Sequence, residues 1–445
     1  MYYDVVCNRK ALTPPQWRSW ASEEDAMPSD SSNPFINRDD LLQLIRKEFT
    51  SLDPHYGEKR GDLLGTLKAP ADEVAARQQA GLPAACANQI LLEISWLANY
   101  RDDWDRAKRR LVDLQKALAQ PDKLEPTQDD EGSWGACCEE WYRKLEPTVD
   151  ALQEVTDSTP MLKALRFMEK LQDAQATLDL LYRLQITDIR NTRKNQRDEL
   201  GAMQTALSQM IFKDGLRDLL IDRPELGFSI SPELEASYTD YLQQTQHPRT
   251  GYWGPWYRFG ERLVMVQDLA FTFHVINYRA GNVDKWPLII DSTLEIEKLI
   301  YPAGWAPKAG GPYNNHNNYD VAVIFALGWP HMSSSQKARV RDRLKSMLDW
   351  CLTTSLDANG FKLDGNSPAD AYYYGVRFLD RVGLWDPAKR FWLHRAPALP
   401  AGLPPPLDLS VKLLQSFEKL NDKSAESDTV RAILRTAACT SGSAP

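Results

Sequence analysis

The chain has 445 residues, of which 43% are hydrophobic and 26% are charged, as in an ordinary water-soluble globular protein. Its 53 basic and 61 acidic residues give a formal net charge of −8, which argues against nucleic acid as the partner. No run of about 18 consecutive apolar residues is present, so the sequence predicts no membrane span.

The chain begins without the charged and then apolar leader of a signal peptide, which favours a cytoplasmic location. If a leader has been removed, the expected location is periplasmic or extracellular. Six cysteines, at positions 7, 86, 137, 138, 351 and 439, have no spacing typical of a metal site and are too few for a disulfide scaffold, so we expect buried thiols. No G-x-G-x-x-G, P-loop, H-E-x-x-H or G-x-S-x-G motif occurs, and the sequence predicts neither a metal nor a cofactor.

Residues 1–35 are expected to be irregular, because Pro14-Pro15 and clusters of Ser, Asp and Asn interrupt them. Between residues 36 and 397, nearly every periodic segment predicts a helix, and none alternates as a strand would. Ala87–Leu97 is apolar nearly all round. The next helix, which Asp102 or Asp103 can cap, has one apolar stripe formed by Trp104, Leu111, Leu114 and Leu118.

A basic stretch follows at residues 183–197, where five basic residues accompany a single acid, Asp188. Such a patch on an acidic protein can bind an anionic ligand, and Arg190 and Arg197 are the candidates for this role. A solvated helix face is the alternative.

Helices of two kinds alternate along the chain. Val321–Leu327 is apolar all round, whereas the helix that follows begins at a capping box of Ser333 and Gln336. That helix has one apolar face, formed by Val340, Leu344, Met347, Leu348, Cys351 and Leu352. The alternation predicts an inner ring of buried helices wrapped by an outer ring of amphipathic ones.

Inner helices are expected to begin near residues 85, 140, 197, 262, 317 and 370, a period of about 55 residues that is typical of repeated units. Six or seven such hairpins would close into an all-α, (α/α)6-7 toroid; an open helical solenoid is the alternative. From residue 398, four prolines predict a rigid linker, followed by one helix (Leu407–Leu420) and a polar tail. We expect this segment to form a C-terminal arm outside the ring.

Two segments near residue 260 contain candidate binding residues. In the loop Gly251–Arg258, Trp253, Trp256 and Tyr257 can stack on sugar rings and Arg258 can bind a carboxylate, unless the loop buries its own aromatic rings. We expect the helix Glu261–Arg279 to place Gln267, Phe271, His274 and Tyr278 on one face. His274 is then either a proton-transfer residue or a hydrogen-bonded core histidine.

The densest polar cluster is Tyr313–Asp320. Burying so many polar groups without partners costs several kcal/mol, so they must be solvated, hydrogen-bonded or facing a ligand. The amides of Asn314 and Asn315 can hold a carboxylate, while His316 and Tyr319 can exchange protons. The alternative is an Asn-rich turn that caps a helix.

The next inner helix begins near Asp370. Asp370, Tyr374 and Arg377 are spaced to share one face. If Arg377 meets Tyr319 across the ring, we expect the cation to lower the pKa of the tyrosine. The alternative is a surface helix start capped by Asp370.

The run Asn314-Asn315-His316 with Tyr319, the aromatic loop and the helical hairpins together resemble the α/α-toroid polysaccharide lyases of the alginate and glucuronan lyase types. The likeness spans about residues 180–385, and it departs from the Asn-Asn-His-x-Tyr run of some alginate lyases in that the tyrosine comes one position later. It implies that Asn315 neutralises the uronate carboxylate and that His316 and Tyr319 act as the acid–base pair, with His274 assisting. It also implies an anionic polysaccharide as the partner.

Lyase chemistry suits these residue types. Removing the proton beside an ionised carboxylate requires donors that stabilise the developing negative charge, a base at C5 and an acid at O4. An inverting glycoside hydrolase using Asp268, Asp320 or Asp370 is an alternative, and a non-catalytic carbohydrate-binding toroid is another. The sequence leaves open which uronate polymer is bound, endo or exo action, and the oligomeric state.

Overall fold

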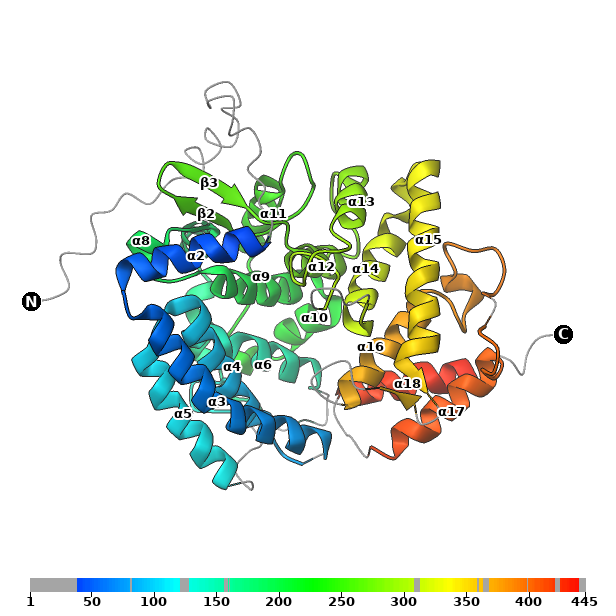
Figure 1. The fold of residues 1–445 in the computed structure, drawn as a ribbon, viewed down its shortest axis with the longest axis horizontal. Helices are drawn as coiled ribbons and strands as arrows, with labels where there is room; N and C mark the ends of the chain where they lie inside the picture. The colour runs from blue at the N-terminus through cyan, green and yellow to red at the C-terminus, as the bar shows by residue number, and fades with distance from the viewer. Residues whose placement is uncertain are drawn as a thin grey trace, which may run out of the picture.

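The computed structural model describes residues 38–80, 82–120, 128–155, 159, 161–307, 313–357, 360–362, 368–397, 399–420 and 425–439. It is mostly helical, which confirms the all-α class (Figure 1). The N-terminal segment predicted to be irregular lies outside the described residues. No helix in the described part of the chain is long and apolar enough to cross a membrane.

Four helices near the N-terminus form one core of their own: α2 (Arg38–Leu52), α3 (Tyr56–Gln79), α4 (Ala85–Trp96) and α5 (Trp104–Ala119). The α5 helix begins where the Asp103 side chain accepts a hydrogen bond from the backbone N–H of Arg106. Its stripe of Trp104, Leu111, Leu114 and Leu118 is buried, as predicted. Tyr257, Val264, Val266 and Ala303 from the middle of the chain complete this core.

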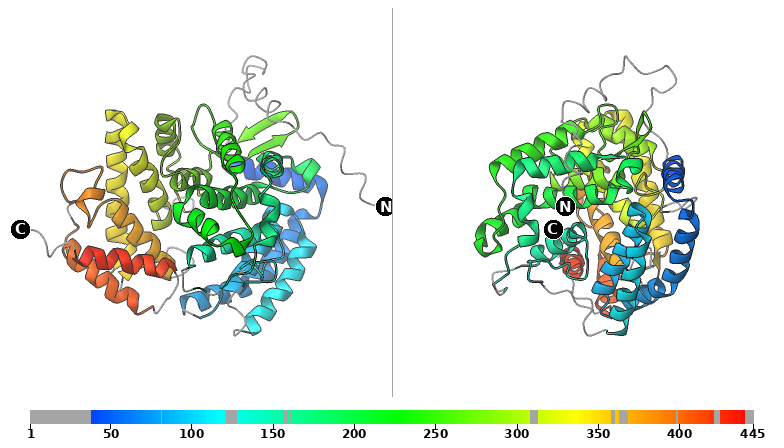
Figure 2. Two further views of the ribbon diagram at one scale, coloured as in Figure 1. Left: turned by 180° about the vertical axis from the view of Figure 1, so that it is seen from behind. Right: turned by 90° about the vertical axis from the view of Figure 1, so that its left-hand side faces the viewer.

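A second and larger core extends from Leu145 to Leu434. Along it, six helices pack each on the next: α6 (Trp141–Gln153), α9 (Arg197–Phe212), α12 (Leu269–Tyr278), α14 (Asn315–Gly328), α16 (Pro368–Arg381) and α18 (Ala425–Cys439). Between them along the chain lie α7 (Ala174–Gln185), α8 (Ile189–Thr192), α10 (Asp214–Asp222), α11 (Pro232–Thr245), α13 (Trp286–Glu295), α15 (Ser334–Trp350) and α17 (Pro406–Glu418). Figure 2 shows these helices from two further sides.

The helix that follows α14 was predicted in detail. The capping box of Ser333 and Gln336 is present in both directions at the start of α15. The predicted apolar face, from Val340 to Leu352, is buried. Most of the predicted inner helices also begin within a few residues of the expected positions.

One expected helix start is wrong. Instead of a helix from Glu261, the chain forms a hairpin of β2 (Trp256–Phe259) and β3 (Arg262–Met265), and β1 (Ile186–Thr187) pairs in parallel with β2. Phe259 pairs with Arg262, and Gly260 supplies the positive φ of 62° that the tight turn requires. The helix begins only where Asp268 accepts a hydrogen bond from the N–H of Phe271. A second pair, β4 (Leu356–Asp357) and β5 (Gly360–Phe361), follows α15.

The C-terminal segment has two helices rather than the one predicted. The α17 helix packs on α18, and α18 packs on α16. Leu413 and Phe417 of α17 and Val430 and Leu434 of α18 are buried in the larger core. The segment therefore belongs to the helical body and is not an arm outside it.

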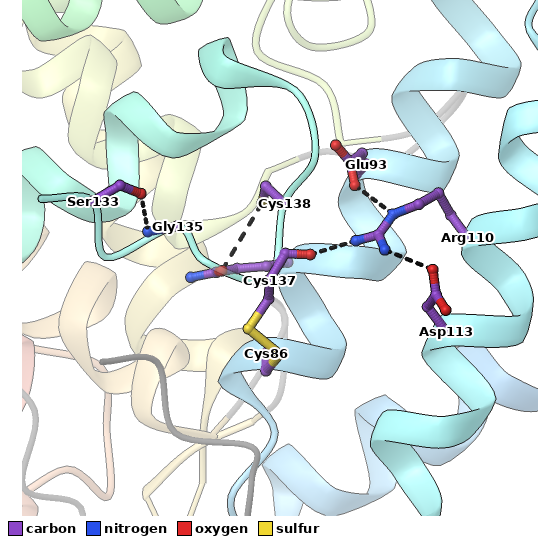
Figure 3. The surroundings of a disulfide bond; sticks show 9 residues. Cys86, Glu93, Arg110, Asp113, Ser133, Gly135, Cys137 and Cys138 are labelled. Atoms are coloured by element: carbon purple, nitrogen blue, oxygen red, sulfur yellow. Dashed lines mark hydrogen bonds and ion pairs between the residues drawn. A yellow bond between two sulfur atoms is a disulfide. The ribbon is translucent and has the colours of Figure 1, made fainter. Parts of the chain in front are cut away.

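The cysteines differ from the expectation of buried thiols, because Cys86 and Cys137 form a disulfide (Figure 3). The bond ties the start of α4 to the segment before α6. Beside it, Arg110 of α5 donates hydrogen bonds to the Glu93 carboxylate and to the carbonyl of Cys137. Cys138 and Cys351 are buried thiols, Cys439 is an exposed thiol, and Cys7 lies outside the described residues.

Candidate functional site

The candidate site is formed where α12, α14 and α16 pack together. The rings of His316 and Tyr374 are stacked with centroids 4.3 Å apart, and Tyr301 lies 5.3 Å from His316. Phe273 of α12 contacts both His274 and Tyr319, at 5.1 and 5.9 Å between ring centroids. The structure thus brings four residues singled out in the sequence, His274, His316, Tyr319 and Tyr374, into one cluster.

Arg377 of α16 joins this cluster. Its guanidinium donates hydrogen bonds to the hydroxyls of Tyr319 and Tyr373. It also lies 4.1 Å from the centroid of the Tyr319 ring and 4.6 Å from that of Tyr373, so it interacts with both ring faces. The predicted meeting of Arg377 and Tyr319 is present.

The pKa of Tyr319 shifts in the direction opposite to the one expected. Burial raises it, and this effect outweighs the opposing influence of Arg377. The Tyr319 side chain is only 3% exposed, so a ligand would have to displace Arg377 to reach its hydroxyl. Tyr319 is therefore a protonated, interior tyrosine.

Both histidines of the cluster are neutral at pH 7. Burial lowers the pKa of His316 and of His274 to about 4 each. The two differ in access, because the side chain of His316 is 37% exposed whereas Nδ1 of His274 is buried and has no hydrogen-bond partner among the described residues. His316 is the more accessible proton acceptor.

Behind His316, the interior face of α14 buries polar groups that have no hydrogen-bond partner among the described residues. Asp320 is 1% exposed, its Oδ2 lies 3.6 Å from Nε2 of His316, and neither of its oxygens accepts a hydrogen bond from the described residues. Burial raises the pKa of the Asp320 carboxyl well above its ordinary range. The amide of Asn318 is equally buried and also lacks partners within the described part of the chain. Unsatisfied buried groups are rare and commonly mark a functional site or unseen solvent.

Two carboxylates of α6 were not found from the sequence. Glu146 and Asp150 are solvent-exposed, yet desolvation raises the pKa of each, for Asp150 to about 7. Glu146 also lines a hollow between α6, α9 and α12. Glu426 of α18 raises the pKa of Asp150 further, and Lys213 at the end of α9 opposes it. An i, i+4 pair of acids is also typical of a solvated helix face, so no sequence signal distinguished these two.

The predicted carboxylate-binding amides have other roles. Asn314 caps α14 by accepting a hydrogen bond from the N–H of Asn317. This is the role in the alternative prediction, an Asn-rich turn that caps a helix. Asn315 is fully buried, and its Nδ2 donates to Ser355 Oγ at 2.7 Å. Because α14 turns this side chain toward β4 and the segment before it, Asn315 is not positioned to hold a substrate carboxylate.

The aromatic loop buries its own rings. Trp253 is 1% exposed and donates its indole N–H to the carbonyl of Leu242, Trp256 is buried in β2, and Tyr257 belongs to the N-terminal core. Arg258, also in β2, is partly buried. These residues pack the interior and offer no ring face to a ligand.

The remaining candidates lie near the helix starts. Gln267 precedes α12 rather than lying on it, so it does not share a helical face with His274. Arg190 forms an ion pair with Glu48 of α2, away from the cluster. Arg197 forms a two-pronged pair with Asp268, at 2.8 and 3.1 Å. Asp268 and Arg197 therefore neutralise each other.

Two hollows in the described part of the chain are lined by polar and charged side chains. One of about 150 Å³ lies between α6, α9 and α12 and is lined in part by Glu146, Arg197 and His274. The other, of about 380 Å³, lies at the start of α5; among its charges, Lys59 pairs with Asp53 and Lys194 with Glu199. The smaller hollow is the one that adjoins the cluster. Among the described residues, no group of three or more His, Cys, Asp or Glu side chains is arranged to hold a metal ion.

Comparison of the chain with protein-family models, with curated proteins and with solved structures finds no match.

Proposed function

We propose that the protein cleaves a uronate-containing polysaccharide by β-elimination, the reaction of the alginate and glucuronan lyases that the sequence resembles. The single observation that carries this proposal is the cluster in which Tyr374 stacks on His316 and packs beside Tyr319, the tyrosine that Arg377 holds. It combines a neutral base, a protonated phenol and a fixed cation, which are the groups that the reaction requires.

The proposal includes an α/α toroid with the cluster at its centre. Packing of each inner helix on the next, from α6 through α18, supports a ring. The electrostatic effect of Glu426 on Asp150 supports its closure, since this pair links the last helix of the series to the first. In such a ring the polar side chains of α6, α12, α14 and α16 face a shared cavity.

Each group has a separate role in the proposed reaction. Arg377 binds the uronate carboxylate and stabilises the negative charge that develops when C5 loses its proton. His316 accepts that proton, because it is unprotonated and partly exposed. Tyr374, whose pKa burial raises, remains protonated and donates to the leaving oxygen at C4. Tyr319 holds Arg377 and acts as a positioning residue.

A panel of uronate polymers tests this proposal. Each polymer is incubated with the protein while ultraviolet absorbance records the conjugated double bond that only β-elimination creates. We expect an absorbance rise with at least one polymer, and a fall in rate of roughly 10²-fold or more for His316→Gln. No absorbance rise from any uronate polymer would overturn the proposal.

An inverting glycoside hydrolase is the second candidate, and the observation that favours it is the pair of α6 carboxyls with raised pKa, Glu146 and Asp150. A carboxyl with a pKa near 7 suits a general acid, and an inverting enzyme pairs such a group with a second carboxylate about 6.5–9.5 Å away. The hydrolase would be selected if the wild type released new reducing ends without an absorbance rise and Asp150→Asn released none. Binding without either product would leave a carbohydrate-binding protein.

The disulfide supports an oxidising location. Disulfides persist in secreted and periplasmic proteins and are rare where thiols are kept reduced. We therefore propose that the protein works outside the reducing cytosol, in the compartment where extracellular polysaccharides are also found. Mass spectrometry of the protein isolated from its native source, with thiols blocked before lysis, checks this: Cys86 and Cys137 should be joined.

A further inference from the structure

The hollow between α6, α9 and α12 has the size of one six-membered ring. Its volume is about 150 Å³, and an engineered cavity of about that volume holds a benzene molecule. Gly201 of α9 contributes to the space, since a Cβ there would come within 3.3 Å of the Phe271 ring. The lining of the hollow includes Arg143, Glu146, Arg197, Asp198, Gln204 and His274.

The lining contains two polar atoms without partners. Gln204 is 4% exposed; its Nε2 donates to the hydroxyl of Tyr241, while its Oε1 has no hydrogen-bond partner among the described residues. The second atom is Nδ1 of His274. A buried polar atom without a partner costs free energy, which a ligand hydroxyl that bonds to it would recover.

The charges around the hollow leave no cation available for an anionic ligand. Arg143 forms an ion pair with Asp198, and Arg197 forms ion pairs with both Asp198 and Asp268. Glu146 is the remaining titratable side chain of the lining, and in its ionised form it would repel a carboxylate. The hollow therefore suits a neutral ring with several hydroxyls.

We propose that this hollow is a subsite for one neutral pyranose, recognised by Gln204 and His274. The inference rests on the proposed function, and it deepens it. If a uronate binds at Arg377 and a neutral sugar binds beside His274, the substrate alternates uronate with neutral sugar and is not a homopolymer of uronate. His274 links the two positions, since it lines the hollow and its ring packs on Phe273, which in turn packs on Tyr319 of the cluster.

Binding of small glycosides tests the subsite without any cleavage. Saturation-transfer NMR is recorded for the wild type with methyl glucoside, methyl mannoside, methyl galactoside and methyl glucuronide. We expect binding of at least one neutral glycoside and weaker binding of the glucuronide. Gln204→Leu should weaken neutral-glycoside binding about tenfold, the effect of one buried hydrogen bond.

Two further variants keep the test decisive. Gln204→Leu also removes the bond to Tyr241, so Ala202→Leu, which fills the hollow and keeps that bond, is measured in parallel. Ala176→Leu, at an exposed position of α7, is the matched control and should bind as the wild type does. Thermal unfolding confirms that each variant is folded.

The outcomes separate the two proposals. Unchanged binding in both Gln204→Leu and Ala202→Leu, a preference for the glucuronide, or no binding of any neutral glycoside would overturn the subsite. Specific binding of a neutral glycoside without an absorbance rise from any polymer would overturn the lyase and keep the subsite. Faster cleavage of an oligosaccharide alternating glucuronate with a neutral hexose than of polyglucuronate would support both.

Discussion

Arg377 donates hydrogen bonds to the hydroxyls of Tyr319 and Tyr373, but no such bond joins it to Tyr374 among the described residues. Tyr319 is interior and bonded to the guanidinium, whereas Tyr374 is partly exposed and stacks on His316. Proximity to a cation was expected to make Tyr319 the proton-transfer residue. Burial opposes ionisation more strongly than Arg377 favours it, so Tyr319 is better suited to hold the cation.

The two tyrosines should therefore respond differently to loss of the hydroxyl. We expect Tyr374→Phe to lower kcat by roughly 10²-fold or more, because the leaving oxygen loses its acid. Tyr319→Phe should chiefly raise KM, because Arg377 loses a hydrogen bond that orients it toward the carboxylate. Steady-state kinetics on the best polymer of the panel measures both. Full turnover in Tyr374→Phe would show that another group is the acid.

The raised pKa of Asp150 predicts a pH-dependent stability difference. Its folded-state pKa, about 7, lies above the ordinary value of 3.8, so the folded state favours the protonated form. This contribution to stability is complete below pH 3.8 and is lost as pH rises through 7. We expect Asp150→Asn, which cannot ionise, to be more stable than the wild type at pH 8, with the difference shrinking toward pH 4.

Calorimetric Tm values at pH 4, 6 and 8 measure this effect. His274 and His316 contribute in the opposite direction, since their lowered pKa values favour stability above pH 6.5. Both proteins contain these histidines, so their contribution cancels in the difference. Asp218→Asn, at an exposed position of α10, is the control. If the difference in Tm between the wild type and Asp150→Asn stayed constant from pH 4 to 8, it would contradict the raised pKa of Asp150.

At the scale of elements, the disulfide and a buried ion pair fix α4, α5 and the approach to α6 together. Glu93 of α4 is fully buried, pairs with Arg110 of α5 at 2.7 Å, and accepts hydrogen bonds from the N–H groups of Glu139 and Glu140. Figure 3 shows Arg110 reaching from Glu93 to the carbonyl of Cys137. The carboxylate thus has a partner on each side, as a buried charge requires.

Removing the disulfide should be costly. Cys86 and Cys137 are 51 residues apart, and closing a loop of that length stabilises a protein by about 4 kcal/mol in the chain-entropy model. We expect Cys86→Ala with Cys137→Ala to lower the free energy of unfolding by up to that amount in urea titrations. Cys439→Ala, an exposed thiol, is the control. Equal stability of the double variant and the wild type would mean that the bond is absent or without effect.

Helix positions were predictable where local signals agreed. The capping box at Ser333 and the stripe from Val340 to Leu352 act within one helix, so the sequence alone contains them. The hairpin before α12 was missed because apolar residues at 263–266 continue the helical pattern, although Gly260 between two short apolar runs is a turn signal. The α18 helix was missed because few apolar residues, chiefly Val430 and Leu434, mark its buried side.

The site was predictable only in part. Spacing along one helix suggested His316 with Tyr319 and Tyr374 with Arg377, and the structure brings the two helices together, with Tyr374 against His316 and Arg377 against Tyr319. Whether Asn315 faces a ligand or the core depends on the rotation of α14 against its neighbours, which no local pattern fixes. Glu146 and Asp150 join the site only through tertiary packing.

At the scale of the whole molecule, the C-terminal helices should be indispensable. Phe417 of α17 is fully buried and packs on Tyr372 with ring centroids 5.1 Å apart. Truncating such a residue leaves a cavity, and we expect Phe417→Ala to cost about 3–5 kcal/mol of unfolding free energy. Chemical denaturation measures this, with Lys412→Ala, an exposed position on the same helix, as the control. A loss below about 1 kcal/mol would indicate that the segment is a dispensable arm after all.

The composition of the N-terminal core has a consequence for biosynthesis. Although α2 to α5 leave the ribosome first, their core is completed by Tyr257, Val264, Val266 and Ala303, which are translated much later. At 5–20 residues per second, the nascent chain waits roughly 10 to 40 s between the end of α5 and Ala303. During that interval the apolar surface of α4 and α5 is exposed. We therefore expect the nascent chain to depend on a chaperone that covers apolar helices until translation has passed the middle of the message.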